Sequence, residues 1–122
     1  MMTLKEALSM AGSYCDVVWL GTYHTVNLYK EDIEKYCLYE TEIEEQPYTK
    51  AKYFTLHVVY NRSICKDFVN TLKLHQKGIW NGKTLEQIAD IFEDLPLSEI
   101  KFYITSCMAY GLLEHQGDLY AW

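Results

Sequence analysis

The chain has 122 residues, of which 49% are apolar and 23% are charged, and its formal net charge is −6. These proportions indicate one compact domain or two small subdomains that share a core, and they exclude a disordered chain. A net acidic chain is repelled by phosphate backbones and anionic lipid headgroups unless a local basic cluster offsets its charge. The longest series of basic residues, Lys66, Lys73, Lys77 and Lys83, is dispersed, so binding to nucleic acid or to a membrane is not expected.

The sequence lacks the common signals of secretion, membrane insertion and catalysis. Its start has no basic segment followed by an apolar run, and no run approaches the roughly 18 apolar residues that span a bilayer. We therefore expect a cytoplasmic protein with reduced thiols. The Cys residues have no zinc-site spacing, and no phosphate-binding loop or nucleophile motif is present, so no metal, cofactor or enzymatic activity is predicted. A Cys–His pair that the fold assembles, for example Cys15 with His24, stays an open alternative.

A short helix and a hairpin are predicted at the start of the chain. Thr3 is suited to cap a helix over residues 4–12, which Gly12 ends. Residues 16–22 and 25–29 are rich in β-branched and aromatic side chains. The short polar segment between them favours a β-hairpin.

Three further elements complete the predicted first subdomain. Residues 30–36 have the pattern of a helical turn, with acids in the first turn where the helix dipole favours them. Residues 38–45 alternate as a strand does, and residues 52–60 are apolar on both faces, as expected of a central strand. Residues 1–62 should therefore form an α+β subdomain, with one helix and a three- or four-stranded, mainly antiparallel sheet.

Three glutamates of the predicted strand over residues 38–45 have alternate positions. Glu40, Glu42 and Glu44 would point to one face of that strand, about 6.6 Å apart at a rise of roughly 3.3 Å per residue. One interpretation is a row of carboxylates that binds the basic groove of a nucleic-acid-binding protein, as a DNA mimic does. The other is a solvated edge strand whose like charges oppose aggregation.

The apolar period changes from strand to helix after Asn61. Ser63 is suited to cap a helix that ends near Gly78, and its stripe consists of Ile64, Phe68, Val69 and Leu72. Residues 79–84 form a link with room for a short strand. Thr84 and Gln87 then have the spacing of a capping box. The helix that they begin has a buried stripe of Leu85, Ile88, Ala89 and Phe92.

A turn, a second helix and a hairpin follow. Pro96 ends the turn, and Ser98 is suited to cap the helix after it, which Gly111 ends. One face of this helix is apolar and consists of Ile100, Tyr103, Ile104 and Cys107. Residues 112–114 begin a strand, and residues 119–122 return antiparallel to it after a turn with Gly117 at its tip.

The order of these elements over residues 63–122 resembles the winged helix-turn-helix superfamily. The resemblance implies that the second helix, over residues 98–110, is presented to a partner, usually DNA, whose base edges are read by Arg, Lys, Asn or Gln. The face expected to be exposed holds one cation and one acid, and consists of Glu99, Lys101, Phe102, Thr105, Ser106, Met108 and Ala109. The expected wing tip adds an acid, Asp118. Direct DNA binding is therefore not favoured.

We expect this face to bind protein instead, because Phe102, Met108 and Ala109 make it apolar. The alternative is that the chain's own first half covers Phe102 and Met108. The predicted protein-binding residues are Lys101, Phe102, Thr105, Met108 and Ala109, together with Glu40, Glu42 and Glu44.

The leading hypothesis is a small, acidic, non-enzymatic protein that binds another protein. Its size and acidity are similar to those of accessory proteins of bacteriophages and mobile elements, including anti-CRISPR inhibitors. This generic resemblance implies a basic, nucleic-acid-binding partner. Two alternatives are a winged-helix transcriptional regulator, whose dimer assembles a basic surface, and a structural protein that self-associates through the Phe102 face.

Overall fold

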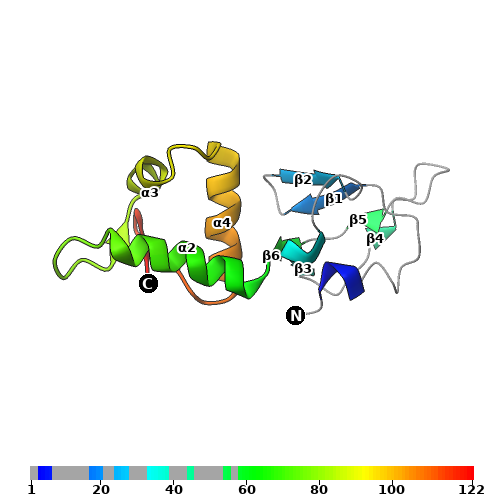
Figure 1. The fold of residues 1–122 in the computed structure, drawn as a ribbon, viewed down its shortest axis with the longest axis horizontal. Coiled ribbons are helices and arrows are strands. Elements are labelled where there is room, and N and C mark those ends of the chain that lie inside the picture. The colour runs from blue at the N-terminus through cyan, green and yellow to red at the C-terminus, as the bar shows by residue number, and fades with distance from the viewer. Residues whose placement is uncertain are drawn as a thin grey trace. The chain divides into compact units, whose positions relative to one another are not determined.

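A computed structural model describes residues 3–6, 17–20, 24–27, 33–38, 44–45, 54–55 and 58–122. The chain divides into two compact units, Met1–Asn61 and Arg62–Trp122. Helices and small antiparallel sheets both occur, which confirms the α+β class (Figure 1). No helix within the described ranges combines the length and the apolar character that crossing a bilayer requires.

The first unit contains the predicted hairpin. Strand β1 (Val17–Leu20) pairs antiparallel with β2 (His24–Asn27), in a register that runs from Val17 opposite Asn27 to Leu20 opposite His24. The second strand begins at His24, one residue earlier than expected.

The remaining described strands of this unit form two antiparallel pairs. Strand β3 (Tyr36–Leu38) pairs with β6 (Val58–Tyr60), and β4 (Glu44–Glu45) pairs with β5 (Phe54–Thr55). The described strands form three two-stranded sheets, where one sheet of three or four strands was expected. Residues 39–43 and 56–57, which connect two of these pairs, lie outside the described residues. The segments expected as single strands over residues 38–45 and 52–60 are each shared between two pairs. The β4–β5 pair lies further along the same two segments as the β3–β6 pair, so these segments are antiparallel partners in both.

Two predicted helical segments of the first unit are described in part. The Thr3 hydroxyl accepts a hydrogen bond from the backbone N–H of Glu6 at 3.2 Å, as a cap does, and Leu4 is fully buried. Residues 7–12 lie outside the described residues. A 3-10 helix, η1 (Ile33–Lys35), stands where a helical turn was expected.

The second unit has three helices and a three-stranded sheet in the order that the sequence predicts. Strand β9 lies between β7 and β8 and is antiparallel to both. Helix α4 packs against α2 and α3. The elements are α2 (Arg62–Leu74), β7 (Gly82–Lys83), α3 (Leu85–Ile91), α4 (Leu97–Ala109), β8 (Glu114–Gln116) and β9 (Leu119–Ala121).

Short-range hydrogen bonds fix the helix ends of this unit. The Thr84 hydroxyl accepts from the Gln87 backbone N–H at 3.2 Å, and the Gln87 side chain accepts from the Thr84 backbone N–H at 3.0 Å, which confirms the capping box. After Gly111, which has a φ of 71°, the N–H of Leu112 donates to the Cys107 carbonyl at 2.9 Å. Only glycine adopts such a φ readily, so Gly111 ends α4 as predicted.

The start of α4 differs from the prediction. Pro96 is the N-cap residue, and no side chain caps the helix. The Pro96 carbonyl accepts hydrogen bonds from the backbone N–H groups of Glu99 at 3.0 Å and Ile100 at 3.1 Å. Proline fixes its own φ and places its carbonyl for the first turn, so the helix begins at Leu97 and Ser98 lies inside it.

Candidate protein-binding pocket

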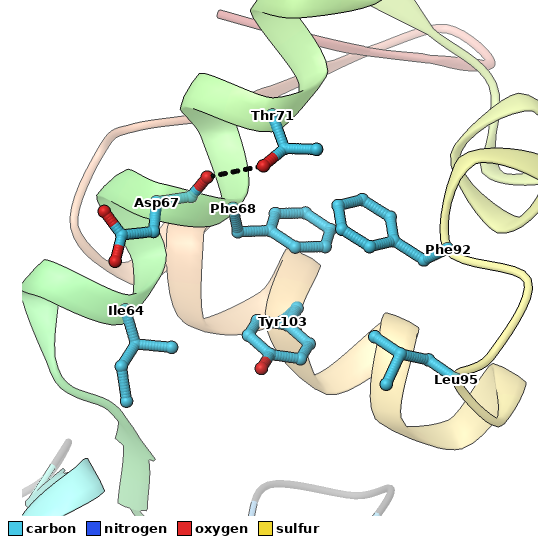
Figure 2. Close-up of a pocket in the computed structure, with 7 residues that line it drawn as sticks. All are labelled: Ile64, Asp67, Phe68, Thr71, Phe92, Leu95 and Tyr103. Carbon is cyan, nitrogen blue, oxygen red and sulfur yellow. Dashed lines mark hydrogen bonds between the residues drawn. The ribbon is translucent and has the colours of Figure 1, made fainter.

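A pocket of about 270 Å³ opens between α2, α4 and the segment that follows α3 (Figure 2). Its lining is mostly apolar and consists of Ile64, Phe68, Phe92, Leu95 and Tyr103, with Asp67 and Thr71. Each helix contributes for a local reason. Ile64, Phe68 and Thr71 recur at spacings of four and three on α2, which puts them on one face. Phe92 caps the C-terminus of α3.

Three aromatic rings form one wall of this pocket. Phe68 stacks on Phe92, with ring centroids 4.6 Å apart, and on Tyr103, with centroids 4.8 Å apart. Phe68 is 4% exposed, whereas Phe92 and Tyr103 are half-buried. Each stacked pair contributes about 0.5–1.5 kcal/mol beyond the burial of its area. The rings are therefore held in place before any ligand arrives.

The polar side of the pocket lies on α2. The Thr71 hydroxyl donates a hydrogen bond to the backbone carbonyl of Asp67 at 3.0 Å, which leaves its methyl group for the pocket. Figure 2 shows the Asp67 carboxylate pointing away from the rings. Asp67 is exposed, and its carboxylate makes no ion pair with a described residue. The Asp67 carboxylate is therefore a negative charge, without an ion-pair partner among the described residues, at the margin of the apolar pocket.

The predicted binding face of α4 is only partly exposed. Phe102 is 1% exposed and Ser106 is fully buried, so the expectation that they lie on an exposed face is wrong. The reason is that α4 is buried on two sides. Ile100, Ile104 and Cys107 form one buried side, and at roughly 100° per residue Phe102 and Ser106 lie on the opposite side.

The other predicted residues of α4 keep some exposure. Lys101, Thr105 and Ala109 are half-buried, and the Thr105 hydroxyl donates to the Lys101 carbonyl at 2.9 Å. Met108 is 40% exposed and Leu97 is 50% exposed. Leu97, Lys101 and Met108 recur at spacings of four and seven, so the exposed stripe of α4 is narrow and holds one cation.

The predicted acidic row belongs to the first unit, whereas the pocket belongs to the second. Glu40 and Glu42 lie outside the described residues. Glu44 belongs to β4, opposite Thr55, and its side chain is outside them as well. Among the described residues, no group of His, Cys, Asp and Glu is placed to hold a metal ion.

The pocket itself was not predicted from the sequence. Phe68, Phe92 and Tyr103 were each placed on a buried helix face, but their stacking depends on how three helices meet. One signal was available. Aromatic residues lie on α2, on α4 and at the C-cap of α3, and the smaller Thr71, one turn after Phe68, leaves space beside the rings.

The Cys107 thiol on α4 is hydrogen-bonded to the backbone of Cys65 on α2. The Cys107 Sγ donates a hydrogen bond to the Cys65 carbonyl at 3.6 Å, and both residues are fully buried. The hydrogen bond with Cys65, together with burial, raises the pKa of the Cys107 thiol far above its ordinary value. This thiol is therefore protonated and poorly nucleophilic, which fits a structural role.

Comparison of the chain with protein-family models, with curated proteins and with solved structures finds no match.

Proposed function

We propose that the unit Arg62–Trp122 binds another protein and holds one apolar side chain of that protein in the pocket. The observation that carries the proposal is an open hollow of about 270 Å³ with three stacked rings in its wall. A cavity of about 150 Å³ holds benzene, so this pocket has room for an indole, a phenyl ring or a branched aliphatic group. Apolar anchors seated in such pockets commonly dominate binding energy.

The charge of the chain supports a basic partner. The net charge is −6, and Asp67 at the pocket margin makes no ion pair within the described part of the chain. A cation beside the anchor would approach this carboxylate while the anchor enters the pocket. Glu40, Glu42 and Glu44 are a second proposed attraction for such a partner. A small protein that covers a basic surface is suited to inhibit a nucleic-acid-binding protein, and this role requires no chemical step.

Two matched tripeptides test the pocket directly. We expect acetyl-Lys-Trp-Lys-amide to shift the backbone amide resonances of Phe68, Phe92 and Leu95 in a saturable way. Acetyl-Glu-Trp-Glu-amide should bind more weakly, because its charges oppose Asp67. The measurement is a nuclear magnetic resonance titration of the full chain at low salt, where charge effects are largest.

Variants at the pocket margin provide the controls. Thr71→Arg should abolish the shifts, because a long cationic side chain fills the hollow, whereas Thr71→Ser should preserve them. Leu97→Ser changes an exposed side chain of the α4 stripe and should also preserve them. Equal binding by wild type and Thr71→Arg would refute the proposal.

DNA binding is the second candidate, and the order of elements favours it. The unit has helix, strand, helix, helix and two strands, and the proposed resemblance to winged helix-turn-helix proteins rests on this order. Against this candidate, the exposed stripe of α4 has Lys101 as its single cation, and the β8–β9 turn holds Asp118. A gel shift with duplex DNA at about 50 mM salt tests it, because electrostatic affinity is greatest at low salt. Binding that Lys101→Ala weakens would favour this candidate.

A further inference from the structure

The last residue of α2 and the loop that follows it expose three large apolar side chains. Leu74 is 85% exposed, Ile79 is 93% exposed and Trp80 is 70% exposed. Monomeric proteins rarely leave large apolar side chains grouped in this way without a partner. The group lies within seven residues, so it forms one local feature, which we call the apolar loop (residues 74–80).

Hydrogen bonds hold the apolar loop in one conformation. The backbone N–H of Trp80 donates to the Lys77 carbonyl at 3.2 Å, and Gly78 provides the φ of 61° that this turn needs. The Gln76 side chain donates to the Gly78 carbonyl at 3.1 Å and accepts from the Trp122 indole at 3.2 Å. Because the turn is already ordered, binding through it loses little conformational entropy.

The apolar loop lies in the most basic stretch of the chain. Between Asp67 and Glu86 the chain has no acidic residue and three lysines, Lys73, Lys77 and Lys83. This stretch corrects the view that the basic residues are merely dispersed. Lys73 and Lys77 are exposed beside the apolar side chains. Lys83 is buried, and Lys77 lines a hollow that also holds Asp90 and Glu93. The loop with its exposed lysines therefore suits a partner that has an apolar hollow and a carboxylate beside it.

A second copy of this chain has both properties. Its pocket combines an apolar lining with the Asp67 carboxylate at the margin. The apolar loop does not enter the pocket of its own chain in this structure. Phe68 precedes Leu74 by six residues, roughly 9 Å along α2, and the loop extends beyond that end of the helix (Figure 1).

We propose that the apolar loop of one copy docks into the pocket of another, with Trp80 or Ile79 in the hollow and Lys77 near Asp67. This inference rests on the proposed function, because it uses the same pocket. It replaces the basic foreign partner by a second copy, whose Lys77 supplies the cation beside the anchor. Each copy has one loop and one pocket, so the contact is head-to-tail. Such contacts produce open chains or closed rings and not a symmetric dimer.

A mixing experiment tests this geometry. One variant, Ile79→Ser with Trp80→Ser, removes the loop anchors and keeps the pocket. The other, Asp67→Lys with Thr71→Arg, blocks the pocket and keeps the loop. The changed residues are exposed or half-buried, and Lys and Arg are good helix formers, so both proteins should fold, as circular dichroism would verify. Sedimentation velocity of the full-length proteins, from micromolar to millimolar concentration, is the measurement.

We expect the average mass of the wild type to rise with concentration beyond that of a dimer or to reach a ring. Each variant alone should stay monomeric. Their equimolar mixture should double in mass and stop there, because only one intact contact remains. A wild type that stays monomeric at millimolar concentration, or a mixture that stays monomeric, would overturn the inference. A pocket-blocked variant that still dimerises would instead show a loop-to-loop contact and would also overturn it.

The peptide titration separates this inference from the proposed function. If the wild type is monomeric but acetyl-Lys-Trp-Lys-amide still binds at Phe68 and Leu95, the pocket serves a foreign protein and only the inference fails. If the peptide does not bind either, the proposed function fails as well.

Discussion

The ring of Phe68 on α2 lies parallel to the ring of Tyr103 on α4, with centroids 4.8 Å apart and planes inclined by 5°. The contact joins two helices of the second unit, and the same rings line the pocket. Stability and binding therefore depend on shared side chains. Variants at the margin, such as those at Asp67 and Thr71, are needed to test binding, whereas variants of the rings test stability.

Phe68→Ala should lower the free energy of unfolding by about 3–5 kcal/mol, because it leaves a cavity where a 4% exposed ring touches two others. Phe68→Leu keeps much of the volume and should lose less. Urea unfolding followed by circular dichroism is the measurement. An Ala variant as stable as the Leu variant would mean that the ring is not tightly packed.

The raised pKa of Cys107 predicts a loss of stability in alkali. Below the ordinary thiol pKa, about 8.5, both the folded and the unfolded chain keep this proton. Above it the unfolded chain releases the proton and the folded chain does not, so the free energy of unfolding falls by up to about 1.4 kcal/mol per pH unit. Urea unfolding at a series of pH values from neutral to mildly alkaline measures this slope.

Cys107→Ser is the control for that experiment, because serine keeps a donor for the Cys65 carbonyl and does not titrate in this range. The free energy of unfolding of this variant should fall less steeply with pH than that of the wild type, and the difference in slope should correspond to one proton. Identical slopes for the two proteins would show that Cys107 ionises equally in both states.

Thr84→Ala should lower the free energy of unfolding by about 0.5–2 kcal/mol, because it removes the hydroxyl that accepts from the Gln87 N–H. Thr84→Ser preserves the hydroxyl and should be close to the wild type. Amide hydrogen exchange of Gln87 gives a local measurement, since its N–H loses its acceptor only in the Ala variant. Unchanged exchange in Thr84→Ala would argue against the capping box.

Gly111→Ala should cost about 1–2 kcal/mol, because a side chain at a φ of 71° strains the backbone. No atom lies within 4 Å of the position that a Cβ would occupy, so strain and not collision is the expected cause. Gly111→Asn should cost less, since Asn tolerates this conformation better. Thermal unfolding compares the three proteins, and an Asn variant less stable than the Ala variant would contradict this explanation.

The elements that the sequence predicted well depend on residues close together in the chain. The capping box of Thr84 and Gln87, the end of α4 at Gly111 and the hairpin of β1 with β2 are all set by hydrogen bonds over a few residues. The start of α4 was missed by a similar local effect, because the Pro96 carbonyl serves where Ser98 was expected to cap. Helix and strand periods also placed Ile100, Ile104 and Cys107 on a buried face correctly.

Contacts between distant segments were decided by the tertiary structure alone. The sequence showed one apolar face of α4. In the structure Phe102, on the opposite side of the helix, is buried as well, because α4 carries apolar residues on both sides and both sides are covered. The pairing of β3 with β6, and the hollow beside Phe68, likewise depend on which surfaces meet. Local hydrogen bonds and periodicity depend on residues that are close together in the sequence. A pocket is the space left between helices, and no short segment of the sequence specifies how those helices pack against one another.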